Sequence, residues 1–150
     1  MKLEQIITPT SVAHEGMTVR EFFAECIRDN TPGLPFCTKS GRIRGRVTLK
    51  NILKTSFLPD YVIESARILG DELATTRDME AKARQLLELP VDPYMQEPHL
   101  SVTSSTSAVK ALALMEQNDT SYLFIVDEGH YRGCVTIQRL ARALFELDHR

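Results

Sequence analysis

Residues 44–51 of the chain read RGRVTLKN, and residues 132–139 read RGCVTIQR. When the sequence is shifted against itself by 88 positions, the glycine, valine and threonine of the two stretches coincide. Self-similarity at a fixed spacing indicates a repeated structural unit. The chain is therefore predicted to contain two copies of one unit, residues 1–57 and residues 90–150, with a different segment, residues 58–89, between them.

Each copy shows the same order of secondary-structure signals. A short extended piece comes first, at residues 11–14 in copy one and 100–103 in copy two, and a helical stretch follows it. Two strands joined by a tight turn come next, and a second helix closes the copy. We predict an α/β (α+β) fold in which two β-α-β-β-α repeats pack as a pseudo-twofold pair with a helical connector.

Apolar residues at helical period predict the buried side of each helix. Thr18 is predicted to cap the first helix of copy one, and Ser105 or Thr106 the first helix of copy two. The predicted buried positions are Val19, Phe22, Phe23, Cys26 and Ile27, then Val109, Leu112 and Met115, and then Leu140, Leu144 and Leu147. The connector is predicted to be helical over about residues 61–88, interrupted near Gly70. Its candidate buried positions are Val62, Ala66, Leu69, Met79, Ala83, Leu86 and Leu87.

The charge of the chain is unevenly distributed. The net charge is −2, yet residues 30–59 contain six basic residues and no acidic one, which leaves −8 for the remainder. A local basic patch on an acidic body favours a small anionic ligand over nucleic acid, which usually meets a domain-wide positive field. Nucleic-acid binding is therefore not expected.

Several other classes of protein are disfavoured by the residues present. The three cysteines form no C-x-x-C pair and match no zinc spacing, so we expect free buried thiols and no metal. No P-loop, Rossmann glycine pattern or nucleophile–base pair is recognisable, so no enzymatic activity is expected. The N-terminal residues lack an apolar signal segment, and no apolar run could span a membrane. We therefore expect a cytoplasmic protein without membrane association.

The repeated corner resembles the motif of the CBS-domain family, Gly-x-hydrophobic-Thr/Ser-x-x-Asp-hydrophobic. Gly45, Val47, Thr48 and Ile52 match it in copy one, and Gly133, Val135, Thr136 and Leu140 match it in copy two. The resemblance covers nearly the whole chain apart from the connector, and it implies a stand-alone CBS pair, or Bateman module. Such a module usually binds an adenosine nucleotide (AMP, ADP, ATP or a related compound) between the repeats. It usually dimerises through its helices and signals to a partner protein, so we expect a homodimer and an effector protein.

The resemblance implies a set of ligand-binding positions. The motif threonines would be Thr48 and Thr136, and the aspartate position falls on Asn51 and Arg139. Asn can accept through one oxygen only and Arg cannot accept at all, so ribose recognition differs from the usual kind at both corners. The remaining implied positions lie before or within the second strand of each copy or in the lead-in segment: Thr8, Leu34, Pro35, Phe36, Tyr122, Leu123 and Phe124. No cofactor other than this regulatory nucleotide is expected.

The basic residues near the two corners allow more than one interpretation. Candidate phosphate-binding residues are Arg44, Arg46, Lys50, His130 and Arg132. The alternative for the arginines at 42, 44 and 46 is a solvated edge strand whose charges discourage aggregation. The alternative for Thr48 and Thr136 is simple helix capping. For the whole chain, the alternative is a ligand-free module for dimerisation or protein interaction.

Overall fold

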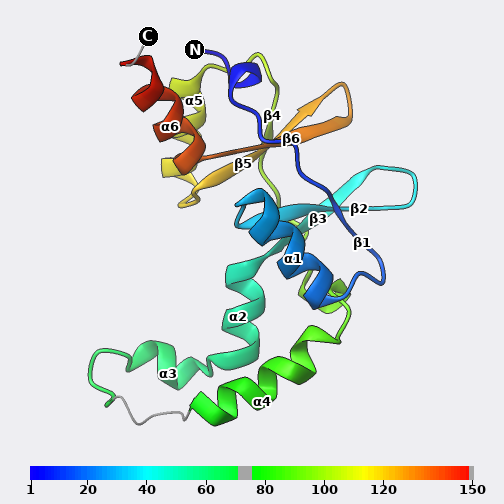
Figure 1. Ribbon diagram of the computed structural model, residues 1–150, viewed down its shortest axis with the longest axis vertical. Helices are drawn as coiled ribbons and strands as arrows, with labels where there is room; N and C mark the ends of the chain where they lie inside the picture. The colour runs from blue at the N-terminus through cyan, green and yellow to red at the C-terminus, as the bar shows by residue number, and fades with distance from the viewer. Residues whose placement is uncertain (71–75, 149–150) are drawn as a thin grey trace.

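The computed structural model describes residues 1–70 and 76–148 (Figure 1). The first repeat contains β1 (Ala13–His14), α1 (Val19–Asp29), β2 (Gly33–Cys37), β3 (Ile43–Thr48) and α2 (Leu49–Phe57). The second repeat contains β4 (Ser101–Val102), α5 (Ala108–Gln117), β5 (Tyr122–Asp127), β6 (His130–Thr136) and α6 (Ile137–Leu147). The predicted β-α-β-β-α order is thus confirmed in both copies.

The two repeats build the same small sheet. In the first, β1 pairs parallel with β2 and β2 pairs antiparallel with β3; in the second, β4, β5 and β6 repeat this arrangement. Gly41 and Gly129 have φ of +84° and +80° in the two hairpin turns, a region in which a side chain would be strained. The turn chemistry therefore fixes both hairpins locally.

Side-chain caps fix where the helices begin. The Oγ1 of Thr18 accepts a hydrogen bond from the backbone N–H of Glu21 at 3.1 Å, as predicted. In the second repeat the cap is Ser107, whose Oγ accepts from the N–H of Lys110 at 3.2 Å. The prediction of Ser105 or Thr106 was wrong, because one extra residue precedes α5 when the two copies are aligned on their corners.

Each sheet is extended by the segment that leads into the other repeat. Gln96 and Arg46 exchange backbone hydrogen bonds of 2.8 and 2.9 Å, and Thr8 and Cys134 exchange bonds of 2.8 and 3.0 Å. The two bridges are related by the same shift of 88 positions. The crossing of a lead-in segment over the sheet of the other repeat therefore occurs once for each copy. Backbone groups of β3 and β6, which lie at the sheet edges, are thereby paired.

The recurrence of glycine at positions 45 and 133 follows from this crossing of the backbone. A Cβ atom on Gly45 would lie 2.3 Å from the carbonyl oxygen of Gln96, and one on Gly133 would lie 2.4 Å from that of Thr8. Gly133 also has φ of +143°. The glycines at the repeated corner are therefore required because a backbone approaches each of them closely.

Each of the two hydrophobic cores contains residues from both halves of the sequence. The first core, around Phe22, Leu34 and Val47, also contains Leu86 and Val91. The second core, which contains Met115, Leu123, Val135 and Leu140, also contains Leu3 and Ile6. Each repeat therefore completes its core with the segment that precedes the other repeat.

The predicted helix faces were only partly right. Val19, Phe22, Cys26, Met115 and Leu140 are buried, but Ile27 is 75% exposed and Val109 is 79% exposed. Leu112, Leu144 and Leu147 are also exposed. The sheet side of α5 and α6 instead carries Ala111 and Ala143, whose small side chains let the helices approach the strands.

In its described residues the connector contains the helices α3 (Asp60–Glu64) and α4 (Thr76–Leu87), which extend away from the sheets (Figure 1). Leu86 is buried and Leu87 packs against the first core, as predicted. Ala66 and Met79 are exposed, so the predicted continuous buried face is wrong there. Residues 71–75, part of the predicted helical stretch, lie outside the described residues.

Candidate functional site

The two threonines of the repeated corner cap the helices that follow them. Thr48 Oγ1 accepts from the backbone N–H of Asn51, and Thr136 Oγ1 accepts from the backbone N–H of Arg139, both at 3.1 Å. Each corner therefore places a hydroxyl and the amino end of a helix at the carboxyl end of a strand. An anion can be held at such a place by helix N–H groups and the helix dipole.

Asn51 has a structural partner that the sequence did not predict. Its side-chain Nδ2 donates a hydrogen bond of 3.2 Å to the carbonyl oxygen of Tyr94, in the segment that leads into the second repeat. An aspartate carboxylate could not donate this bond. The asparagine therefore ties the corner to residue 94 and leaves its side-chain oxygen as the remaining acceptor.

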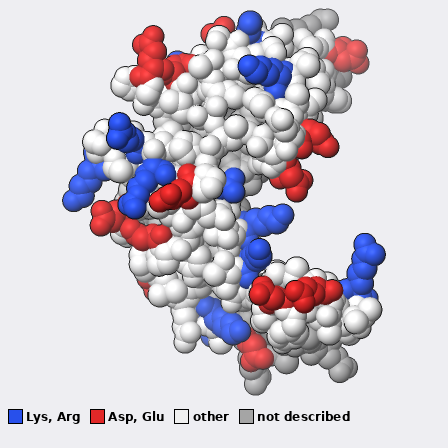
Figure 2. Space-filling model, turned by 180° about the vertical axis from the view of Figure 1, so that it is seen from behind, with Lys and Arg blue, Asp and Glu red and all other residues white. Residues whose placement is uncertain are grey.

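A cavity of about 510 Å³ opens at the Thr48 corner. The first repeat contributes Arg46, Thr48, Lys50, Asn51 and Lys54, and the second contributes residues 115–116 and 118–122, with Gln96 from the lead-in segment. Figure 2 shows a hollow in this side of the molecule with basic side chains on its wall. The cavity thus joins the corner of one repeat to the start of β5 in the other.

The charges lining this cavity are mixed, with a basic excess. Arg46, Lys50 and Lys54 share the lining of the cavity with the carboxylates of Glu116 and Asp119. Lys50 and Lys54 lie one helical turn apart on α2, so they share a face. The cavity can therefore attract a ligand that carries negative charge.

Tyr122 is a largely buried residue in the lining of this cavity. It is 8% exposed, and its ring lies edge-on to that of Phe124, with centroids 5.4 Å apart. Burial raises the pKa of Tyr122 to about 12, although the nearby Arg46 guanidinium acts to lower it. Arg46 and Tyr122 also line an adjoining cavity of about 250 Å³, together with Leu100 and Phe124.

The Thr136 corner has a different environment. Thr136 is 4% exposed, and Cys134, the counterpart of Arg46, is fully buried. The Cys134 thiol forms a hydrogen bond of 3.4 Å with Thr31 Oγ1, which links the two repeats at this point. Arg139 is half-buried, and its Nη1 has no hydrogen-bond partner within the described residues.

The other implied ligand positions are distributed unevenly. Leu34, Pro35 and Phe36 are buried in β2, and Leu123 belongs to the second core. Thr8 contributes its backbone to the bridge with Cys134. Among the implied positions, Thr48, Asn51 and Tyr122 are brought together around the cavity of the Thr48 corner.

The candidate phosphate-binding residues do not all lie at one site. Arg46 and Lys50 line the cavity at the Thr48 corner, whereas Arg44 is exposed on β3. Arg132 pairs with Asp127 at 3.1 Å, and His130 is exposed at the second hairpin. Arg46 is half-buried with its backbone paired to Gln96, so it does not fit the alternative of a solvated edge residue.

Sequence reasoning missed the residues that precede β5. The residues that line the same cavity as Thr48 include Asn118, Asp119, Thr120 and Ser121. Their signal was available in the repeat, because residues 118–121 correspond to residues 30–33, which lead into the second strand of copy one. What the repeat could not show is that this segment of one copy meets the corner of the other.

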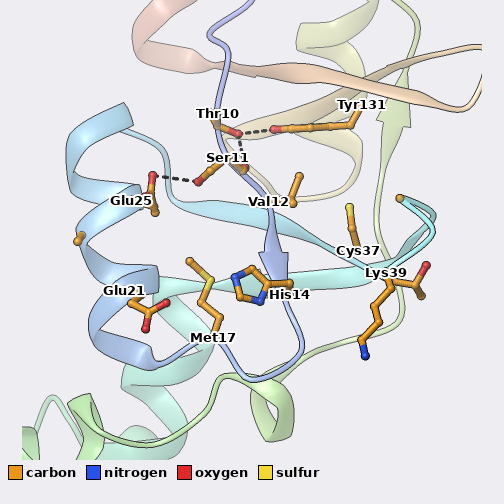
Figure 3. A pocket seen from close by; sticks show the side chains of 13 residues that line it. Thr10, Ser11, Val12, His14, Met17, Glu21, Glu25, Cys37, Lys39 and Tyr131 are labelled. Carbon is orange, nitrogen blue, oxygen red and sulfur yellow. Dashed lines mark hydrogen bonds between the residues drawn. The ribbon is translucent and has the colours of Figure 1, made fainter.

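A larger cavity of about 790 Å³ lies beside β1 and α1 (Figure 3). Two pairs of its polar groups are hydrogen-bonded: Thr10 Oγ1 with Tyr131 Oη at 2.5 Å, and Ser11 Oγ with Glu25 Oε2 at 3.0 Å. Burial raises the pKa of the Cys37 thiol in its wall, so this sulfur is a poor nucleophile. The lining of the cavity at the Thr48 corner is the more basic of the two, with Arg46, Lys50 and Lys54 where the larger cavity has Lys39 as its Lys or Arg side chain.

Within residues 1–70 and 76–148, no group of three or more His, Cys, Asp or Glu side chains is placed to hold a metal ion. The cysteines at 26, 37 and 134 are free and buried, as predicted. None of the helices in this range combines the length and apolar character needed to cross a membrane.

Comparisons with known proteins agree with this architecture. Residues 91–146 match the model of the CBS domain family. A CBS domain of a CBS-domain-containing membrane protein from Sphaerobacter thermophilus is 18% identical, with a TM-score of 0.66, covering 95% of this chain and 86% of the other. A putative acetoin utilization protein (AcuB) from Vibrio cholerae is 13% identical, with a TM-score of 0.68, covering 99% and 93%.

A third solved structure contains a nucleotide. CBSX2 in complex with AMP is 19% identical, with a TM-score of 0.65, and the match covers 97% of each chain. No curated protein sequence matches the chain. The second repeat therefore matches the CBS domain family, and the two repeats together have the fold of the CBS-domain structures.

Proposed function

We propose that the chain is a regulatory CBS-pair module that binds an adenosine-type nucleotide at the Thr48 corner. The observation that carries this proposal is the cavity of about 510 Å³ that joins Thr48, Asn51 and three basic side chains of one repeat to Tyr122 of the other. A ligand bound there would contact both repeats at once. The complex of CBSX2 with AMP supports a nucleotide as the ligand of this fold.

Regulation follows from the position of the cavity between the repeats. A ligand that binds one arrangement of the repeats better than another shifts the population toward that arrangement. In the proposed function, the shift changes the shape of a homodimer, and an effector protein recognises the change.

Calorimetric titration of the purified protein tests the ligand half of this proposal. The panel contains AMP, ADP, ATP, S-adenosylmethionine and GTP, and we expect saturable binding of at least one adenosine compound at micromolar to high micromolar concentration. The control is Thr48→Val, which keeps the shape of the side chain but removes the hydroxyl. Absence of measurable binding heat for every compound of the panel with the wild-type protein would contradict nucleotide binding.

A second candidate function is a dimerisation or protein-interaction module that needs no ligand. It is favoured by large apolar side chains exposed on α5 and α6, namely Val109, Leu112 and Leu144, and by the absence of a carboxylate at positions 51 and 139. Sedimentation analysis without nucleotide distinguishes the two. A stable dimer that Leu144→Glu dissociates, with no response to nucleotides, would favour this candidate.

A further inference from the structure

The two β-hairpins project from the same side of the molecule (Figure 1), and a cavity of about 640 Å³ lies between their tips. It is lined by residues 40–43 of the first hairpin and 129–131 of the second, with His99, Ser101 and Val126. Among the described residues, this lining contains an arginine and two histidines but no carboxylate. It also has no lining residue in common with the cavity at the Thr48 corner, so it is a separate place on the chain.

The first hairpin carries three cations that the chain itself does not neutralise. Lys39, Arg42 and Arg44 are exposed, and none of them forms an ion pair within the part of the chain that the structure describes. The sequence around them, residues 30–59, contains no acidic residue. Uncompensated like charges at one tip repel each other and attract a negatively charged partner.

The second hairpin shows that this charge is not needed to form the turn. There, Asp127 pairs with Arg132 at 3.1 Å. The shift of 88 positions relates these two residues to Lys39 and Arg44. Arg44 therefore lacks the carboxylate that its counterpart has, and a lysine adds a further positive charge in its place. The same hairpin is thus built with an internal ion pair in one copy and with cations alone in the other.

The edge of the first sheet next to this cavity is open to an extended chain. β3 is the outer strand of its sheet, and the lead-in segment bridges it at Arg46. No other backbone bridge to the outer edge of β3 occurs within the described residues. Ile43, near the tip, lines the cavity. An unpaired strand edge can bind an extended peptide through main-chain hydrogen bonds.

We propose that the cavity between the hairpin tips and the adjoining edge of β3 bind an extended acidic segment of a partner protein, whose carboxylates meet Lys39, Arg42 and Arg44. The inference goes beyond the proposed function, because it assigns the surface and the chemistry by which an effector protein is recognised. Glu128, exposed at the second tip, repels carboxylates placed near it, so the segment lies toward the first hairpin.

A nucleic acid fits this surface less well than an acidic peptide. Outside residues 30–59 the chain carries a net charge of −8, which repels a long phosphate backbone. A short peptide needs only the cations of the first hairpin, and its backbone can pair with the edge of β3.

Fluorescence anisotropy of a labelled peptide of alternating glutamate and threonine, titrated with the whole chain, tests the proposal. We expect saturable binding that weakens as salt is added, and no binding of the same peptide with glutamine in place of glutamate. Arg42→Gln is expected to weaken binding by about tenfold. Lys110→Gln, which removes one exposed positive charge from α5, is the matched control and is expected to leave the affinity unchanged.

Lys39→Asp is the sharper variant, because it gives the first hairpin the carboxylate that the second has at Asp127. Arg44 then has a partner within its own hairpin, and we expect peptide binding to weaken by about 100-fold. The melting temperature is expected to stay unchanged or to rise slightly, since an ion pair replaces a repulsion. Unchanged peptide affinity in this variant would overturn the proposal.

The remaining outcomes identify other occupants or none. Absence of binding to the acidic peptide, or tighter binding of a single-stranded oligonucleotide that depends on Arg42, would overturn the inference. Self-association that Lys39→Asp abolishes would mean that a second copy occupies the surface, and this too would overturn it. The peptide assay contains no nucleotide, so its failure leaves the proposed nucleotide site intact, and a chain that binds no nucleotide can still bind the peptide.

Discussion

At the end of β3, Thr48 is half-buried beside a cavity, whereas at the end of β6 Thr136 is only 4% exposed. The backbone of the two corners is the same, down to the 3.1 Å bond from each threonine to the helix that it caps. The residues around them differ: Arg46 and Tyr122 surround the first, and Cys134 and Thr31 contact each other near the second.

This difference teaches that the fold and the ligand chemistry are carried by separate residues of the same short motif. Glycine, valine and threonine recur because the crossing backbone, the core and the helix cap require them. The position between glycine and valine is free to vary, and it carries arginine in one copy and cysteine in the other. One corner can therefore be specialised for a ligand while its twin stabilises the contact between the repeats.

The largest expected effect concerns the glycines that the two corners share, Gly45 and Gly133. Gly133→Ala is expected to lower the free energy of unfolding by about 3 kcal/mol, because the new Cβ meets the Thr8 carbonyl and the backbone is strained. Gly45→Ala, with the clash alone, is expected to cost about 2 kcal/mol. Chemical denaturation measures both.

Gly129→Ala is the control for this pair. It has a positive φ but no atom within 4 Å of the added Cβ, so a cost of about 1 kcal/mol is expected. Equal costs at positions 45, 129 and 133 would contradict the close crossing as the reason for the glycines.

The second-largest expected effect concerns Asn51, which occupies the aspartate position of the motif at the first corner. Asn51→Asp is expected to destabilise the protein by about 1.5 kcal/mol at pH 7, because the carboxylate cannot donate to the Tyr94 carbonyl and faces it as a second acceptor. Asn51→Ala, which loses only the hydrogen bond, is expected to cost about 1 kcal/mol. Denaturation midpoints measure the two variants, and an Asp variant as stable as wild type would show that the Tyr94 contact contributes little.

The third expected effect distinguishes helix capping by the two motif threonines from ligand binding by Thr48. Thr48→Val and Thr136→Val are each expected to cost about 1 kcal/mol, since each removes the acceptor of a helix N–H. Only Thr48→Val is expected to weaken ADP binding as well. Calorimetry on the two matched variants checks this, and an equal loss of affinity in both would remove the functional difference between the corners.

Much of this architecture follows from the sequence, because local signals and the repeat agree. The strands and their order, the Thr18 cap and the glycine turns were predicted from short patterns that act within a few residues. The exposed positions Val109 and Leu112 were predicted wrongly. The sequence of α5 is apolar on several sides, so its period did not identify the face that meets the sheet.

The site was harder to predict, because its contacts join distant residues. The hydrogen bond from Asn51 to Tyr94 and the proximity of Arg46 and Tyr122 depend on how one repeat packs against the other. The 88-residue shift relates equivalent residues of the copies, but it does not say which segment of one copy meets which corner of the other. Only the packed pair shows that Thr48 shares a cavity with the start of β5.

The smallest expected effect concerns the hairpin tips. Hydrogen bonds from Ser104, followed by the Arg132 guanidinium, lower the pKa of Asp127, whereas its counterpart in the first hairpin is Lys39. A carboxyl group with a lowered pKa stabilises the fold above its usual pKa of 3.8 and loses this contribution as the pH falls through the lowered value.

Asp127→Asn is therefore expected to melt slightly below wild type at pH 7. The two melting curves are expected to converge in acid, below pH 3.8. Melting temperatures measured across this range check the sign of the effect. A difference that stays constant into acid would mean that the carboxylate charge is not responsible.

The exchange of core residues between the halves has a consequence for any attempt to divide the protein. A cut in the connector near Gly70 would leave an N-terminal fragment that carries Leu3 and Ile6 but lacks Leu86 and Val91, and a C-terminal fragment with the opposite deficit. Neither fragment can bury its own apolar residues completely, yet each holds what the other lacks. Mixed together, they are expected to fold by complementation, so the two repeats behave as one cooperative folding unit.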